Sequence, residues 1–336
     1  MVAAYQGGET NDAMSRAAAK RDDALSLIDV HHHFIPPFYL DENRERIAKS
    51  RGGSLSEAWL GWSPQRSLDA MDQHGVAQAM LSMSTPGVWF GDAQAALSMA
   101  RRCNDYAAAL VASHPPRFGH FAAVALPEIE GALREIAYAF DVLRADGIAL
   151  LTSYDGKWLG HMDHGPVFDE LNRRHAVVFV HPTVPAAARD MLPGISPMIA
   201  EVPQDTARAI VNLLLTGTMC RFNAIRFIFG HAGGTFPMIA GRLRQYVPAV
   251  TLDAMPENIE DQLRRCWFDI AGTANKPAIA ALTAFASRDC ILFGSDAPHI
   301  QLGETVNGMR RLGLSPSTRA AIGSENATRL FPRLNK

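Results

Sequence analysis

Short apolar segments alternate with longer segments of helical character along most of the chain. Several of the short segments are apolar without interruption, such as AVVFV at 176–180 and CILF at 290–293. Uninterrupted apolar runs of this length are typical of parallel strands that are buried on both faces. We therefore predict eight strands, at Leu27–Val30, Ala77–Met83, Gly119–Val124, Gly147–Leu151, Ala176–Val180, Ile225–Phe229, Cys266–Ile270 and Cys290–Phe293.

The segments between these strands carry helix signals. Ser63 and Pro64 precede the stretch LDAMDQH, which ends at Gly75, so that an N-cap, a first-turn proline and a C′ glycine are all present. Another helix follows Asp92. Further helices are predicted at 127–145, 166–174, 203–219, 236–246 and 277–287, with a last one from 315 onward. Eight strands that alternate with helices predict an α/β fold, either a closed (β/α)₈ TIM barrel or a doubly wound open sheet.

Three consecutive histidines follow the first predicted strand, in the sequence DVHHH at 29–33. Because side chains alternate across an extended strand, His31 and His33 share one face and His32 points away from them. Two imidazoles with this spacing can bind one cation through their ring nitrogens. The same pattern also fits a polar strand end that binds no metal.

Three other predicted strands are also followed by a polar residue. His181 follows AVVFV, His231 follows IRFIFG and Asp296 follows CILFGS. All three lie at carboxyl ends of strands, where a (β/α)₈ barrel places its active site, and this agreement favours the barrel over the open sheet. Each residue alone could be a hydrogen-bonded core histidine or a helix-capping aspartate. A shared metal ion would satisfy the whole buried set, and nitrogen-rich ligation with one carboxylate suits Zn²⁺ and also Mn²⁺.

Composition limits the possible partners and compartments. The 336 residues carry a formal net charge of −2 without a basic block, which argues against a nucleic-acid partner. No apolar run approaches the roughly 20 residues that span a membrane. The first 26 residues lack the hydrophobic core of a secretory signal, and the four cysteines form no CxxC pair, so we expect a cytoplasmic protein without disulfides. We expect one domain at 27–336, with a flexible tail at 1–26 and an insertion at about 34–62 after the first strand.

The motifs around these residues resemble a known family. They are DVHHHFIPP, the STPGV loop at 84–88, FVHPT, FGHAGGTFP, FGSDAP and the terminal ENATRLF at 325–331. Together they resemble the amidohydrolase superfamily, in the branch that contains aminocarboxymuconate-semialdehyde decarboxylase and the aromatic-acid decarboxylases. Within this branch they resemble proteins of the 6-methylsalicylate decarboxylase type. The resemblance covers the chain from Ile28 to Phe331.

The resemblance implies a mononuclear metal site. The implied ligands are His31, His33, His181 and Asp296, which match the family's paired histidines, its strand-5 histidine and its strand-8 carboxylate. His231 matches a histidine that stays off the metal and acts as acid or base. Binuclear relatives carry a bridging lysine after strand 4, whereas the only lysine in GIALLTSYDGK here is Lys157, well past the strand end. One divalent ion, Zn²⁺ or alternatively Mn²⁺, is therefore expected.

The resemblance also points to residues that would contact the substrate. Arg242 matches an arginine that reaches into a neighbouring subunit's active site, which implies a homodimer or a larger homo-oligomer. The insertion, the region that supplies the carboxylate-binding arginine of related enzymes, contains Arg44, Arg46 and Arg51, and the sequence does not distinguish among them; Arg51 is the candidate we name. His299 and Trp89 are candidates for contact with the substrate ring. The alternative for each is structural, as a surface arginine or a packing side chain.

The implied reaction is the non-oxidative decarboxylation of a small ortho-hydroxy aromatic carboxylate of the salicylate type. The metal would bind the carboxylate and the phenolate, and Asp296 or His231 would protonate the ring carbon before CO₂ departs. The same metal could instead activate water against a lactone or an amide, with His231 as the base. Hydration of an unsaturated acid is a third possibility, because a fold does not decide a reaction.

Overall fold

The computed structural model describes residues 26–335, apart from 51–52, 54, 189–190 and 248–257. Eight parallel strands form one sheet in the order β1-β2-β3-β4-β7-β8-β9-β10. Their bounds are β1 Leu27–His33, β2 Val76–Ser82, β3 Phe118–Ala123, β4 Gly147–Leu151, β7 Val177–His181, β8 Arg226–Phe229, β9 Trp267–Asp269 and β10 Ile291–Leu292. Each predicted strand is present, with its ends shifted by a few residues in several cases.

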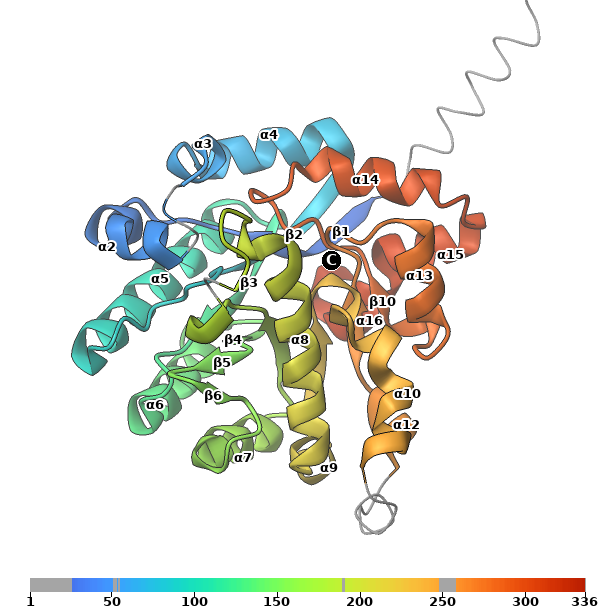
Figure 1. The fold of residues 1–336 in the computed structure, drawn as a ribbon. Coiled ribbons are helices and arrows are strands. Elements are labelled where there is room, and N and C mark those ends of the chain that lie inside the picture. The colour runs from blue at the N-terminus through green and yellow to red at the C-terminus, as the bar shows by residue number, and fades with distance from the viewer. Residues whose placement is uncertain (1–25, 51–52, 54, 189–190, 248–257, 336) are drawn as a thin grey trace, which may run out of the picture.

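The first and last strands meet and close the sheet. The amide of Val30 donates to the carbonyl of Phe293 at 3.0 Å, and the amide of His33 donates to the carbonyl of Ala297 at 2.7 Å. Helices surround the strands on all sides (Figure 1). The fold is therefore the predicted (β/α)₈ barrel, and the open sheet is wrong.

The helices lie outside the strands, and a two-stranded hairpin of β5 (Ser153–Tyr154) and β6 (Lys157–Trp158) follows β4. The α-helices are α2 Pro37–Ser50, α3 Glu57–Leu60, α4 Pro64–His74, α5 Ala93–Ser113, α6 Ile129–Asp141, α7 Gly165–Arg173, α8 Pro197–Leu215, α9 Thr218–Arg221, α10 Phe236–Tyr246, α12 Ile259–Arg264, α13 Lys276–Thr283, α14 Leu302–Arg311, α15 Pro316–Ala320 and α16 Asn326–Leu330. None of the described helices is long and apolar enough to cross a membrane.

The capping signals placed one helix correctly and misplaced another. In α4 the Ser63 side chain accepts the amide of Arg66, and Gly75 ends the helix with a left-handed φ of 75°. The predicted start of α8 at Pro203 was wrong, because the helix begins at Pro197 and Pro203 lies inside it. The full signature of an N-capping serine and a first-turn proline occurs at Ser196 and Pro197, six residues earlier, whereas Val202 precedes Pro203.

The insertion at 34–62 contains α2 and α3 and packs against the barrel. The Tyr39 hydroxyl on α2 donates to the carbonyl of Gly87 at 2.7 Å, in the loop after β2. Trp59 on α3 is only 2% exposed, and its indole stacks on the His299 ring with 5.4 Å between centroids. The insertion therefore covers loops at the carboxyl ends of the strands.

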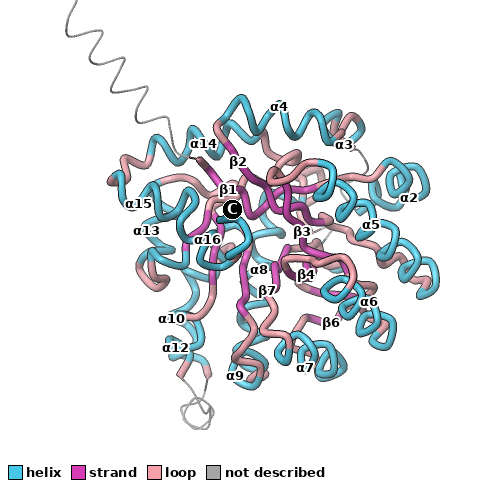
Figure 2. Tube along the Cα trace, turned by 180° about the vertical axis from the view of Figure 1, so that it is seen from behind, coloured by secondary structure: helices cyan, strands magenta, loops and turns pink. Residues whose placement is uncertain are grey.

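The C-terminal segment closes the opposite end of the barrel. Leu330, Phe331 and Leu334 join the cluster of side chains that fills the barrel interior, and Figure 2 shows α16 in front of the strands. The Gln78 side chain near the start of β2 donates to the carbonyl of Leu334 at 3.3 Å. Because the amino ends of the strands are closed in this way, a functional site is expected at the carboxyl ends.

Candidate metal centre

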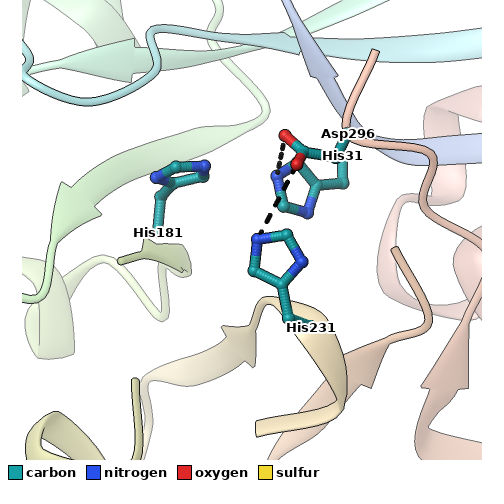
Figure 3. A group of neighbouring side chains, drawn as sticks. All are labelled: His31, His181, His231 and Asp296. Atoms are coloured by element: carbon teal, nitrogen blue, oxygen red, sulfur yellow. Dashed lines mark ion pairs between the residues drawn. The ribbon is translucent and has the colours of Figure 1, made fainter. Parts of the chain in front are cut away.

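Five of the predicted site residues gather at the carboxyl ends of the strands. They are His31 and His33 at the end of β1, His181 at the end of β7, His231 after β8 and Asp296 after β10. All five are buried, with at most 8% of their surface exposed. Figure 3 shows four of them converging on one space from four different segments of the chain.

Three of the ligand atoms form a compact triangle. The Nε2 atoms of His31 and His33 lie 3.2 Å apart, and Asp296 Oδ1 lies 3.3 Å from the first and 3.0 Å from the second. Donors bound to one tetrahedral ion at about 2.0–2.2 Å are separated by about 3.3–3.6 Å. The observed separations are therefore close to those that a shared ion requires.

His181 and His231 complete the group from the other side. Four ligand atoms lie within 4.8 Å of one another, one each from His31, His181, His231 and Asp296. His231 Nε2 is 4.0 Å from Asp296 Oδ2 (Figure 3). His33 belongs to a second such group, with Asp296 and His299. The geometry brings His231 as near to the centre as the predicted ligands.

The rings are held so that their Nε2 atoms face the centre. Each Nδ1 lies within hydrogen-bond distance of a fixed acceptor, to which it donates when protonated, and this leaves the Nε2 lone pair free for a metal. The Nδ1 contacts are His31 to Asp269 Oδ2 at 2.9 Å, His33 to the Ser82 carbonyl at 3.1 Å, His181 to the Pro182 carbonyl at 2.7 Å and His231 to the Ala271 carbonyl at 3.0 Å.

One buried nitrogen of the cluster lacks a hydrogen-bond partner among the described residues. It is Nε2 of His181, a residue that is only 3% exposed. An unpaired polar atom at such a depth is destabilising unless something else binds it. Together with the converging Nε2 atoms and the one carboxylate, this orphaned lone pair fits a divalent metal ion.

The charges of the cluster are coupled through burial. Burial disfavours the charged form of His31, but Asp269 and Asp296 outweigh it and raise the pKa of His31 to about 10. Burial lowers the pKa of His181 well below its usual range. Burial raises the pKa of Asp296, but His299 and His31 overcome this and hold it well below the usual range. The two carboxylates therefore make the centre attractive to positive charge, either a proton on His31 or a metal ion.

Asp269 is a site residue that the sequence analysis missed. It is fully buried at the end of β9 and contacts His31 Nδ1. Its Oδ1 accepts the amides of His231 at 3.0 Å and Ala271 at 2.9 Å. The signal was present, because WFDI at 267–270 places an acid at the end of an apolar run, as in the other strands. Asp269 orients one candidate ligand and the loop that carries His231.

Asp269→Asn is expected to weaken metal binding roughly 10- to 100-fold, the usual effect of losing the acceptor that orients a ligating histidine. An amide cannot take the charge-assisted bond from His31 Nδ1 that the carboxylate takes. Titration of metal-free protein against a competing chelator measures the change. Asp289→Asn is the control, since the Asp289 side chain is 73% exposed. An unchanged metal affinity would contradict the orienting role.

Asp29 joins the first strand to the segment that carries Asp296. Its Oδ1 accepts the amides of His31 at 3.1 Å and Ser295 at 2.9 Å. Its Oδ2 contacts His32 Nδ1 at 3.0 Å, and the other ring nitrogen of His32 contacts the Ser67 hydroxyl at 3.0 Å. His32 therefore points away from the cluster, as expected from strand alternation.

The backbone around the site is strained in two places. His231 has φ of 55° and Asp296 has φ of 64°, a left-handed conformation that is uncommon for residues other than glycine. Such conformations persist where surrounding contacts hold them, often at functional sites. Gly294 in FGSD is needed for a different reason. A Cβ there would lie 2.8 Å from the Cβ of His31 and 2.9 Å from that of Asp269.

The predicted substrate contacts are placed differently from one another. His299 adjoins the centre, with its ring centroid 5.1 Å from that of His33, and it contacts Trp59 Nε1 and the Ser84 hydroxyl. Trp89 is partly buried and packs against the core. Arg242 is exposed on α10, with its guanidinium 4.5 Å from the Tyr246 ring centroid.

Two other predicted features involve the tail and the insertion. Arg51 and the tail up to residue 25 lie outside the described residues. Lys157, the lysine that follows the fourth barrel strand in the sequence, lies on β6 and pairs with Asp163.

Comparison with known proteins gives a consistent result. The family model described as Amidohydrolase matches residues 28–333. The decarboxylase yanB of Aspergillus niger is 37% identical over 92% of this chain and 88% of its own length. The 6-methylsalicylic acid decarboxylase of Penicillium expansum is 35% identical over 92% of this chain and 97% of its own.

A solved structure shows the same fold. It is the dihydroxybenzoic acid decarboxylase of a Polaromonas species, with bound manganese and the inhibitor 2-nitroresorcinol. It is 23% identical and superimposes with a TM-score of 0.81 over 93% of this chain and 98% of that one.

Proposed function

The chain belongs to the amidohydrolase family, as its motifs indicated, and we propose that it is a metal-dependent decarboxylase of a salicylate-type acid. The substrate would be a small aromatic carboxylate with an ortho hydroxyl, and the reaction would be non-oxidative. The observation that carries the proposal is the 35–37% identity to two decarboxylases over 92% of this chain. The hydrolase and hydratase alternatives are not favoured by these relatives. We also place the enzyme in the cytoplasm, on the sequence evidence alone.

We assign the metal to His31, His33, His181 and Asp296. The orphaned His181 Nε2 and the triangle formed by the other three residues support this set. We prefer Zn²⁺, because three nitrogens and one carboxylate suit it, with Mn²⁺ as the alternative. When bound, the ion would supply positive charge for a substrate carboxylate oxygen and the neighbouring phenolate.

His231 is the proposed proton donor. Its Nδ1 lies 3.0 Å from the Ala271 carbonyl, so that in the doubly protonated ring Nδ1 donates to this carbonyl and the proton on Nε2 faces the centre. The 4.0 Å between Nε2 and Asp296 Oδ2 is too long for a direct hydrogen bond. Asp296 is the second candidate, through its Oδ2 oxygen.

The proton moves from the donor to the ring carbon that bears the carboxylate, and a new C–H bond forms. The bond to the carboxylate carbon then breaks, CO₂ leaves, and its electron pair restores the aromatic ring. A positioned acid contributes about 10²- to 10⁴-fold to such a step. We propose that His299 and Trp89 contact the ring, with Arg51 as the candidate for the carboxylate.

We further propose that the chain forms a homodimer or a larger homo-oligomer in which Arg242 contributes to a neighbouring site. Large apolar side chains on two adjacent helices support this proposal. Ile199 on α8 is 71% exposed, and Met238 and Tyr246 on α10 are 77% and 70% exposed. Arg242 lies on the same helix, with its guanidinium over the Tyr246 ring.

Isotopes from the solvent test the reaction itself. In D₂O the product is expected to carry one deuterium on the ring carbon that bore the carboxylate, because the proton comes from an exchangeable acid. In H₂¹⁸O the product is expected to gain no label. Mass spectrometry of the product from metal-loaded protein and a panel of salicylates measures both. A lactone or amide that opens with ¹⁸O, without ring deuteration of any salicylate, would replace the decarboxylase by a hydrolase.

A further inference from the structure

Asp205 on α8 is a buried acid that the proposed reaction does not use. Its side chain is fully buried, which raises the pKa of the carboxyl group. Its Oδ2 accepts the hydroxyl of Thr152, which follows β4, and the amide of Thr183 at 3.2 Å, and these two contacts oppose the rise. Thr183 lies two residues after His181, the histidine at the end of β7 (Figure 3). The carboxylate therefore binds the loop that directly follows a proposed metal ligand.

A single peptide unit joins Asp205 to the ring of His181. The Pro182 carbonyl and the Thr183 amide belong to the same peptide bond, which is trans, so the two groups point in opposite directions. The amide binds Asp205 Oδ2, and the carbonyl lies 2.7 Å from His181 Nδ1. Rotation of this peptide would break both contacts. The carboxylate and the imidazole are therefore coupled through the orientation of one peptide plane.

Thr152 holds the same loop at a second point. Its hydroxyl oxygen accepts the Thr183 amide at 3.0 Å and donates to Asp205, while its own amide donates to the His181 carbonyl at 3.0 Å. Pro182 has no amide hydrogen of its own, so the Thr183 amide is the donor through which this part of the loop can be fixed. The loop is thus held on both sides of Pro182.

The contact at Nδ1 decides which nitrogen of His181 is available to a metal ion. A neutral imidazole carries one ring proton, and a strong acceptor at Nδ1 places the proton there and leaves the Nε2 lone pair free. A peptide whose N–H donates to a carboxylate is polarised, which makes its carbonyl a better acceptor. Asp205 is arranged to act on His181 through one peptide, whereas Asp269 contacts His31 Nδ1 directly at 2.9 Å.

We propose that Asp205 is a positioning residue of the metal centre, which holds the Pro182–Thr183 peptide so that its carbonyl fixes the His181 ring with Nε2 toward the ion. The inference rests on the proposed assignment of His181 as a metal ligand. Because Asp205 acts through His181, a change at position 205 is expected to alter metal binding first and turnover only as a consequence.

Asp205→Ala is expected to weaken Zn²⁺ binding roughly 10- to 100-fold, the usual effect of losing a group that orients a ligating histidine. Asp205→Asn retains a side-chain oxygen for the Thr183 amide, so its loss of affinity is expected to be smaller. Titration of metal-free protein against a competing chelator measures both changes. Glu201→Ala is the matched control, because Glu201 is an acid on the same helix that pairs with Arg208 instead, and it should bind zinc as the parent does.

Cobalt(II) as a probe distinguishes a positioning role from a general loss of stability. Paramagnetic Co²⁺ shifts the Nδ1–H signals of its histidine ligands away from the rest of the proton NMR spectrum, so the parent should show one signal for each of His31, His33 and His181. Asp205→Asn is expected to move the His181 signal, or to speed its exchange in D₂O, and to leave the other two in place. Asp269→Asn should move a different signal, because Asp269 contacts His31.

Unchanged zinc affinity in folded Asp205→Ala would overturn the inference. Movement of all three cobalt-shifted signals together would also overturn it, because this would indicate a loosened end of the barrel rather than the loss of one orienting contact. If Asp205→Ala does not fold, the signals of Asp205→Asn decide. A parent that binds no metal would overturn the metal site itself, whereas a parent that binds metal but decarboxylates no salicylate would overturn the proposed reaction and leave the role of Asp205 intact.

Discussion

His31→Ala and His181→Ala are expected to lose the metal ion and with it about 10³-fold or more of kcat. The ion stabilises developing charge by several kcal/mol, and each 1.4 kcal/mol corresponds to about tenfold in rate. Both side chains direct Nε2 to the centre through a fixed Nδ1 contact. Removal of either leaves an incomplete ligand set around the ion.

Metal content and turnover measured on the same samples test this prediction. His175→Ala is the control, because His175 is exposed and lies outside the cluster. Removal of the metal from the parent by a chelator should abolish activity while circular dichroism stays that of a folded barrel, since a core of this size does not depend on one ion as a zinc finger does. Full activity in metal-free protein would exclude the metal-dependent reaction, and two tightly bound ions per chain would exclude the mononuclear site.

His231→Asn is expected to retain most of the metal and to lose about 10²- to 10⁴-fold of kcat. That is the usual contribution of a positioned acid. Asparagine suits the position because His231 has a left-handed φ of 55°, a region that asparagine tolerates better than most residues. The backbone of the loop should therefore survive the change, and the loss should report the missing imidazole.

His175→Asn is a matched control, since His175 is exposed and has φ of 50°. Metal analysis decides the role of His231, because its ligand atom lies in the same 4.8 Å group as those of three proposed ligands. If His231→Asn were as depleted of metal as His181→Ala, His231 would be a metal ligand rather than an acid. Retained metal with unchanged kcat would leave the proton donation to Asp296.

The sequence predicted the barrel because its strands are locally encoded. Runs such as AVVFV and CILF can only be buried on both faces, and eight of them separated by helices leave few architectures. His181, His231 and Asp296 follow three of these runs directly, so their place in the fold followed once the strands were known. The paired histidines on β1 needed only the alternation of a strand.

The helix signals were less decisive where two prolines lie six residues apart. Pro203 resembles a first-turn proline, but the structure starts α8 at Pro197, after the capping Ser196. The capping serine marked the correct proline, and the prediction missed it because a proline usually does not lie inside a helix; here packing of the rest of the helix tolerates Pro203.

What the chain determined by itself is therefore the order of the strands, the barrel and the set of polar residues at the strand ends. What only the tertiary structure decided is how those residues are held. Asp269 contacts His31 across 238 positions of sequence, and Trp59 of the insertion stacks on His299 across 240. Local patterns encode strands and caps, whereas contacts between distant segments depend on the packing of the whole barrel, which no local pattern records.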